Sequence, residues 1–121
     1  MRSIGCIMML MFYLRCKLSK LYKMEKNQIQ KFIVRCDRAG VFYGEIASRN
    51  GREVEMTNVR QLWYWDGAAA LMQLAQEGTK APRNCKFTVE VESLQVLDAI
   101  EIIPCTEKAI ESIDAVAVWK I

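Results

Sequence analysis

The chain has 121 residues, enough for one domain with a modest core, and a formal net charge of +3. Residues 1–23 carry five basic residues and no acid, so the overall +3 less their +5 leaves about −2 for residues 24–121. The domain therefore lacks the basic face that DNA or RNA binding requires, and we expect no nucleic-acid partner. The absence of histidine removes the commonest general base and the commonest transition-metal ligand.

Five cysteines are present, and no two of them have the C-x-x-C spacing of a metal site or a redox motif. Only three lie outside residues 1–23, which is an odd number. Structural disulfides and zinc are therefore not expected. The cysteines are typical of reduced thiols in a cytoplasmic protein. They are Cys6, Cys16, Cys36, Cys85 and Cys105.

The leader, residues 1–23, is apolar and basic. Its apolar run, Ile4 to Leu14, is shorter than the roughly twenty residues that span a bilayer, so we expect no membrane association. No small-residue cleavage site follows it, which argues against a signal peptide. Because Met24 opens an ordinary polar run, we hypothesise that translation starts there and that residues 24–121 form the domain. A full-length mass of protein expressed from its native upstream sequence would contradict this.

Three strands are predicted in the first half of the domain. Residues 31–36 (KFIVRC) and 41–48 (VFYGEIAS) are rich in β-branched and aromatic residues. Residues 52–57 (REVEMT) alternate charged and apolar side chains, as a half-exposed strand does. Between the last two strands, Asn50-Gly51 indicates a hairpin turn, since both residues accept positive φ at low cost.

An aromatic run, residues 60–65 (RQLWYW), precedes a predicted short helix. Asp66 is expected to cap the start of the helix and Gly78 to end it. Ala68, Leu71, Met72 and Ala75 fall on one helical face, and Gln73, Gln76 and Glu77 fall mainly elsewhere.

The second half of the domain reads as strands and one more helix. Pro82 marks a loop over residues 79–84, and residues 85–91 alternate as a strand. Residues 94–103 favour a strand with a bend, although periodicity alone also allows a helix. Thr106 is a predicted helix N-cap, and the closing VAVWK favours an edge strand or a strand exchanged with a neighbouring copy. The predicted class is α+β, mainly antiparallel sheet with two short helices.

No catalytic arrangement is visible, so we expect no enzyme. There is no glycine-rich phosphate loop, and the serines have no histidine partner. Asp98 and Glu101 would face opposite sides of a strand. Cys85 and Cys105 have neighbouring lysines but no positioned base. No cofactor and no metal site are expected.

A ligand-binding site is better supported, because flat aromatic faces and forked arginines occur together. If residues 60–65 are extended, their side chains alternate, so at least one tryptophan belongs to the core, and any one of the arginines can equally be a solvated side chain. The loop at residues 80–86 followed by Phe87 offers charge, amide and ring together. The candidate ligand-binding residues are Arg38, Arg60, Trp63, Trp65, Arg83, Asn84, Lys86 and Phe87.

The segments VFYGEI, TNVRQLWYWDGAA, CKF at Cys85 to Phe87, DAIEIIPCTEKA and VAVWK resemble a family of small phage and prophage proteins. These are the Thoeris anti-defence sponges, which sequester glycocyclic ADP-ribose, the signal made by bacterial TIR proteins. The similarity extends from about Lys31 to the end of the chain and leaves out the leader.

The resemblance implies a homo-oligomer built from dimers, either a dimer or a hexamer, with ligand pockets between subunits in the host bacterial cytoplasm. It implies that the signal is released intact on denaturation, and some members are associated with cyclic oligonucleotides at a separate site. We expect adenine to stack on a tryptophan or Phe87, and phosphates to bind Arg60, Arg83 or Lys86. Two alternatives remain: an oligomeric phage accessory protein that contacts another protein and binds no small molecule, and a small hydrolase of a nucleotide signal.

Overall fold

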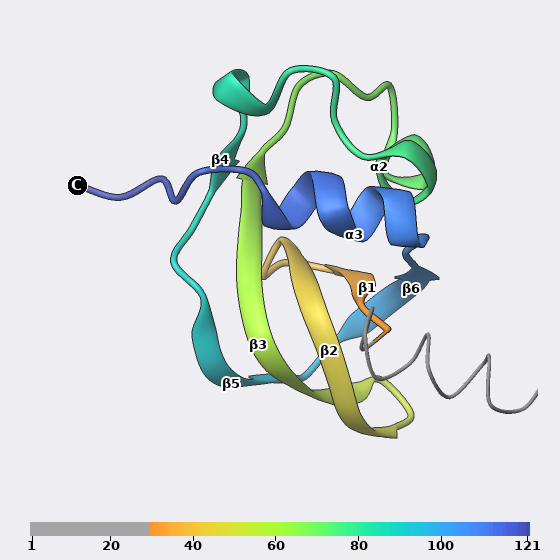
Figure 1. Ribbon diagram of the computed structural model, residues 1–121. Helices are drawn as coiled ribbons and strands as arrows, with labels where there is room; N and C mark the ends of the chain where they lie inside the picture. The colour runs from red at the N-terminus through yellow and green to blue at the C-terminus, as the bar shows by residue number, and fades with distance from the viewer. Residues whose placement is uncertain (1–29) are drawn as a thin grey trace, which may run out of the picture.

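The computed structural model describes residues 30–121 (Figure 1). The leader and the proposed start at Met24 lie outside the described residues. The α+β class is confirmed: within residues 30–121 a six-stranded sheet packs with two α-helices. The elements in chain order are β1 (Phe32–Cys36), β2 (Val41–Asn50), β3 (Glu53–Tyr64), α2 (Leu71–Glu77), the 3₁₀ helix η1 (Pro82–Asn84), β4 (Lys86–Phe87), β5 (Val91–Val96), β6 (Ala99–Pro104) and α3 (Glu107–Asp114).

The named strands pair antiparallel in the order β4-β3-β2-β1-β6, and β5 also pairs with β3. The predicted hairpin is confirmed, since β2 ends at Asn50 and Gly51 takes a φ of 60°. None of the helices within residues 30–121 is long and apolar enough to cross a membrane.

Both faces of the sheet carry a core, because neighbouring strand residues point to opposite sides. Ile33 and Tyr43 belong to a first cluster, which packs against α2 and α3. Their neighbours Val34 and Phe42 belong to a second cluster, to which β5 and β6 also contribute. Since β5 and β6 lie toward opposite ends of the strand order, the sheet curls around this second cluster (Figure 1).

A bulge in β3 decides which side chains face the helices. Glu45 pairs with Thr57 and Tyr43 pairs with Arg60, so Asn58 and Val59 together oppose the single residue Gly44. Asn58 has a φ of 51°, a left-handed conformation that asparagine tolerates. A Cβ on Gly44 would lie 2.9 Å from the Asn58 carbonyl oxygen, so the strands can approach this closely only at a glycine.

As a result of the bulge, the alternation along β3 changes phase. Val54 and Met56 contribute to the second cluster before it, and Leu62 contributes to the first cluster after it. Arg60 is likewise turned toward the helices, and Trp63 is turned away from them.

The helix after the aromatic run begins later than predicted. Gly67 turns the chain with a φ of 83°, and Ala70 is still extended, so α2 starts at Leu71. Asp66 is therefore not the N-cap. Its carboxylate instead accepts hydrogen bonds from the Gly67 amide at 2.8 Å and from Asn84 Nδ2 at 3.2 Å.

The apolar face of α2 is only partly buried. Leu74 and Ala75 are buried, whereas Met72 is 65% exposed. The helix packs against α3 through its C-terminal end, where Gly78 lies against Ser112, and Gly78 ends the helix as predicted with a φ of 77°. Because the helix contacts α3 at this end, the residues buried are Leu74 and Ala75, which follow Met72.

In the second half of the domain, the predicted strands are divided differently. β4 contains only two residues, and the apolar stretch after it splits at Leu97 and Asp98 into β5 and β6. The N-cap prediction is confirmed, since the Thr106 hydroxyl accepts a hydrogen bond from the Ala109 amide at 3.2 Å. The closing segment contributes one bridge, in which Val118 pairs with Phe87.

Candidate functional site

The feature that stands out on the surface is a pair of tryptophans. Trp63, at the end of β3, and Trp119, in the C-terminal segment, have ring centroids 6.2 Å apart and planes only 15° from parallel. Trp63 is 61% exposed and Trp119 is 40% exposed. Two indoles this exposed present flat apolar faces to solvent and to any ligand.

A lysine completes this surface. The Lys86 ammonium lies 5.5 Å from the Trp119 ring centroid, within cation–π range. We call Trp63, Lys86 and Trp119 the aromatic surface. It combines two planar faces with a positive charge, a combination that suits a flat anionic molecule.

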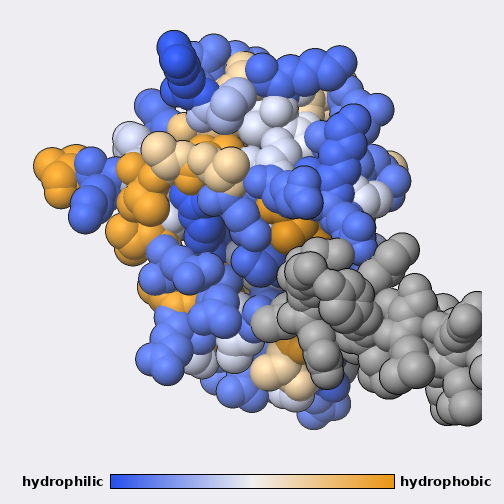
Figure 2. Space-filling model, in the orientation of Figure 1, coloured by the Kyte–Doolittle hydropathy of each residue, from blue (hydrophilic) through white to orange (hydrophobic). Residues whose placement is uncertain are grey.

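The strand pairing explains how these three residues meet. Leu62 pairs with Phe87, and Phe87 forms the bridge with Val118. The register of β3 and β4 then shifts, so that Lys86 pairs with Tyr64. Trp63, Lys86 and Trp119 are the chain neighbours of Leu62, Phe87 and Val118, and all three are exposed. The Trp119 amide donates a hydrogen bond to the Phe87 carbonyl at 2.8 Å and fixes the C-terminal segment beside β4. In Figure 2 this segment, at the left, carries strongly hydrophobic residues among hydrophilic ones.

Trp119 was not among the predicted site residues. No local motif links it to Trp63, which lies far away in the sequence. The signal that could have found it is the β-prone VAVWK segment, because an edge strand there can bring its tryptophan next to another strand.

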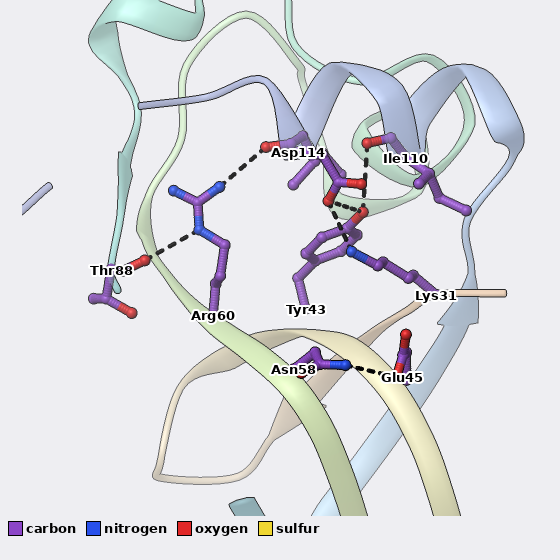
Figure 3. Close-up of polar contacts among 9 residues, drawn as sticks. Lys31, Tyr43, Glu45, Asn58, Arg60, Thr88, Ile110 and Asp114 are labelled. Carbon is purple, nitrogen blue, oxygen red and sulfur yellow. Dashed lines mark hydrogen bonds and ion pairs between the residues drawn. The ribbon is translucent and has the colours of Figure 1, made fainter. Parts of the chain in front are cut away.

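Arg60 does not belong to this surface, and its predicted role in phosphate binding is not supported by its position. It is 6% exposed, and its guanidinium donates to four backbone carbonyls. Figure 3 shows the bond to Thr88. Nε donates to Thr88 at 3.1 Å and Nη1 to Ile113 at 3.2 Å, while Nη2 donates to Phe87 and Ala117. A guanidinium has five N–H donors, so most of them are occupied inside the protein.

Burial also lowers the pKa of Arg60. The nearby charges act in the opposite direction, and Asp114 has the largest effect among them. The side chain ties β4, the end of α3 and the C-terminal segment together. We infer that Arg60 is a structural residue that holds the segment carrying Trp119 in place.

Phe87 is also internal. Its side chain is fully buried in the first cluster, and the Arg60 guanidinium lies 5.5 Å from its ring centroid. A ligand therefore has no access to the ring in this structure, and the position of Phe87 does not support the predicted stacking of adenine on it. Trp65 is half-buried and packs against the same cluster, so it is the tryptophan of the aromatic run that joins the core.

The remaining predicted site residues are divided between two regions. Arg83 and Asn84 are exposed in η1, immediately before Lys86 in the chain, and Asn84 is bonded to Asp66. Arg38 lies elsewhere, in the turn between β1 and β2, where it lines a cleft of about 510 Å³. A second cleft of about 520 Å³ is lined by residues that include Arg49, Arg52 and Glu101. Neither cleft includes Trp63 or Trp119.

A polar network beneath α3 was not predicted from the sequence. The Tyr43 hydroxyl donates to the Asp114 carboxylate at 2.9 Å, and the Lys31 ammonium lies 3.0 Å from the same carboxylate (Figure 3). Burial, followed by Asp114, raises the pKa of Tyr43. This network fixes the C-terminal end of α3 on the sheet, and the C-terminal segment follows directly.

Within residues 30–121, no three residues among histidine, cysteine, aspartate and glutamate lie close enough to hold a metal ion. Cys36, Cys85 and Cys105 are buried as free thiols. Burial raises the pKa of Cys36 and raises that of Cys105 to about 12, which keeps both thiols protonated and weakly nucleophilic.

Fold and surface together define a small α+β domain whose curled sheet presents an exposed aromatic and cationic surface at one edge. A family model matches residues 29–113, which is more than half of the chain, and the chain belongs to that family, described as "Domain of unknown function (DUF6948)". No curated protein and no solved structure matches the chain.

Proposed function

We propose that the protein is a sponge that binds and sequesters a cyclic ADP-ribose-type signalling nucleotide, glycocyclic ADP-ribose, without degrading it. The observation that carries this proposal is the exposed pair of near-parallel indoles, Trp63 and Trp119, with the Lys86 ammonium beside them. Every base has a face that stacks on an indole, and such stacking contributes about 1–3 kcal/mol per base. The sequence resemblance to the anti-defence sponges supports the same class of ligand.

Charge on and near the aromatic surface suits a diphosphate. Lys86 supplies one ammonium, and Arg83, exposed in η1 just before β4, supplies a guanidinium that can hold phosphate by two parallel hydrogen bonds. Arg60 is excluded from this role because its donors are directed at backbone carbonyls. The ligand-binding set that we propose is therefore Trp63, Arg83, Lys86 and Trp119.

The aromatic surface is open on a single protomer. We propose that a homo-oligomer, a dimer or a hexamer built from dimers, covers the two indoles with a second subunit and so completes an enclosed pocket. Enclosure would remove the ligand from water and strengthen the contacts of its phosphates with Lys86 and Arg83.

Sequestration acts by mass action and requires no chemistry. Tight binding lowers the concentration of free signal below what a bacterial immune effector needs, so the protein must be present at no less than the concentration of the signal. Under this proposal the protein acts in the host bacterial cytoplasm.

The test is a fluorescence titration of the full chain with purified cyclic ADP-ribose-type product of a TIR enzyme. Trp63→Ala should weaken binding by about tenfold or more, because one stacking face is lost. Lys86→Ala should weaken it less and reduce its dependence on salt. Arg49→Ala, which removes an exposed arginine that lines a separate cleft, is the matched control. If Trp63→Ala and Lys86→Ala are folded and bind normally, the aromatic surface is not the site.

An oligomeric phage accessory protein that acts through protein contacts is the alternative, and one observation supports it. Tyr64 and Val118, the chain neighbours of Trp63 and Trp119, are also exposed. Clusters of exposed apolar side chains often mark protein interfaces. Under this alternative no nucleotide binds at any concentration, while Trp63→Ala abolishes a complex with a host or virion protein.

A further inference from the structure

The cleft of about 510 Å³ lies between two turns at the other end of β1 from α3. One wall is the turn between β1 and β2, which includes Arg38, and the other is the turn between β5 and β6, which includes Leu97. Its volume is within the range of small-molecule sites. Because none of Trp63, Lys86 and Trp119 lines it, the cleft is separate from the aromatic surface.

The floor of this cleft is apolar. Phe42, Leu94 and Val96 line it, and all three also belong to the second core cluster, so the cleft is an opening into that core. Leu97 lines the wall and is 67% exposed. Burial, with a smaller effect of Asp98, raises the pKa of the Cys36 thiol in the lining, so the floor carries no charge at neutral pH. An apolar group placed there would displace water from these side chains.

The two walls are held at a fixed separation. The Asp37 amide, in the first turn, donates a hydrogen bond to the Asp98 carbonyl, in the second turn, at 3.2 Å. Within the first turn, the Cys36 amide donates to the Gly40 carbonyl at 2.8 Å. The Gln61 side chain donates to the Ala39 carbonyl at 3.4 Å and supports the same turn. A cleft formed in advance binds a ligand without a large cost of ordering.

The rim presents two opposite charges side by side. Asp37 and Arg38 both line the cleft and are exposed, and neither forms an ion pair with any residue from 30 to 121. The Asp98 carboxylate, by contrast, lies 3.4 Å from Arg52. The rim therefore offers one carboxylate and one guanidinium whose partners are not supplied by this part of the chain.

We propose that this cleft binds a small zwitterion with an apolar body, namely a free apolar α-amino acid such as leucine or phenylalanine. Arg38 would hold the carboxylate, for which a guanidinium has the matching fork of donors, and Asp37 would hold the ammonium. The apolar side chain would lie on Phe42, Leu94 and Val96. An anion alone would leave Asp37 unpaired beside it, and a cation alone would leave Arg38 unpaired.

The experiment is calorimetric titration of the full-length protein with L-phenylalanine, compared with 3-phenylpropanoate, which lacks the amine, and 2-phenylethylamine, which lacks the carboxylate. We expect L-phenylalanine to bind and each comparison compound to bind at least about tenfold more weakly. Arg38→Gln and Asp37→Asn should each weaken L-phenylalanine binding by a similar factor, and Leu97→Ser by less. Arg49→Gln, at an exposed arginine outside this cleft, should leave it unchanged.

Equal binding of 3-phenylpropanoate and L-phenylalanine, or no binding of L-phenylalanine up to about 10 mM, would overturn the assignment. The assignment would also be overturned if Arg38→Gln bound L-phenylalanine as tightly as the wild-type protein does. Nucleotide binding, measured on the same samples, is expected to be unchanged by Asp37→Asn, so the outcome here does not depend on the proposed function.

Discussion

The indole of Trp63 lies nearly parallel to that of Trp119, with 6.2 Å between the ring centroids, although the two residues come from the end of β3 and from the C-terminal segment. The contact exists because β4 stands between the two segments and bonds to both. The aromatic surface therefore depends on the contacts that hold the C-terminal segment against β4. The buried side chain of Arg60 provides such contacts, because it donates hydrogen bonds to Phe87 in β4 and to Ala117 in the C-terminal segment.

Replacing Arg60 should therefore destabilise the domain and disturb the tryptophan pair. Arg60→Met leaves four carbonyl oxygens without their side-chain donor, and we expect a loss of about 2–4 kcal/mol in the free energy of unfolding. Urea denaturation measures the loss. The exposed Arg83→Met is the matched control and should change stability by less than about 0.5 kcal/mol. Equal stability of the two variants would show that Arg60 is not the anchor.

The glycine at the bulge gives a second prediction. Gly44→Ala places a methyl group 2.9 Å from the Asn58 carbonyl oxygen, and backbone on both strands must move to admit it. We expect a loss of about 2–4 kcal/mol in the free energy of unfolding. At Gly51 a Cβ meets nothing within 4 Å, so Gly51→Ala, strained only by its φ of 60°, should cost about 1 kcal/mol. A smaller loss at Gly44 than at Gly51 would contradict the described register.

Stability should fall at alkaline pH. The Cys105 thiol has its pKa raised from 9.0 to about 12 by burial, so the folded state retains a proton that the unfolded state has lost. The unfolded chain binds fewer protons in this range, and the free energy of unfolding decreases as pH rises from about 9 to about 12. Tyr43, whose pKa is also raised, acts in the same direction above about pH 10.

Denaturation curves at pH 8 and pH 10.5 test this prediction. Cys105→Ala removes one of the buried groups whose pKa is raised and should show a smaller decrease in stability between the two pH values than the wild-type protein. Tyr43→Phe should also reduce the decrease, while an exposed substitution such as Arg49→Gln should not change it. The same decrease in all four proteins would mean that neither buried group is responsible.

Trp119 should matter to ligand binding as much as Trp63 does. Trp119→Ala removes the other indole face and the ring that Lys86 contacts, so we expect about a tenfold weaker affinity for the nucleotide. Trp119→Phe should retain part of the affinity, because it keeps a smaller ring. Normal binding by Trp119→Ala, with weakened binding by Trp63→Ala, would limit the site to the β3 side of the surface.

Much of the fold could be predicted from local patterns. β1, the hairpin at Asn50 and Gly51, and the Thr106 cap each depend on residues that are adjacent in the sequence. The start of α2 could not be predicted, because Asp66 has the chemistry of an N-cap but Gly67 turns the chain before a helix can form. The helix propensity of single residues does not show whether the cap at Asp66 or the turn at Gly67 prevails.

The site was harder to predict because its geometry depends on the bulge. Arg60, next to an aromatic run, has the composition of a ligand-binding residue, yet Asn58 and Val59 together oppose Gly44 and turn Arg60 inward. The same phase change leaves Trp63 outside. Sequence spacing could not identify Trp119 as a site residue, because its contact with Trp63 requires that β4 and the C-terminal segment lie side by side.

The most direct test of the sponge proposal is to mix purified full-length protein with the product pool of an active TIR enzyme. Unbound material is then removed, the protein is denatured by heat, and the released molecules are analysed by mass spectrometry. We predict that an intact cyclic ADP-ribose-type nucleotide is released in proportion to the protein, and that Trp63→Ala releases much less. Recovery of no nucleotide, with the signal unchanged in the unbound fraction, would contradict the proposal and favour the protein-contact alternative. Recovery of a degraded product would indicate a hydrolase.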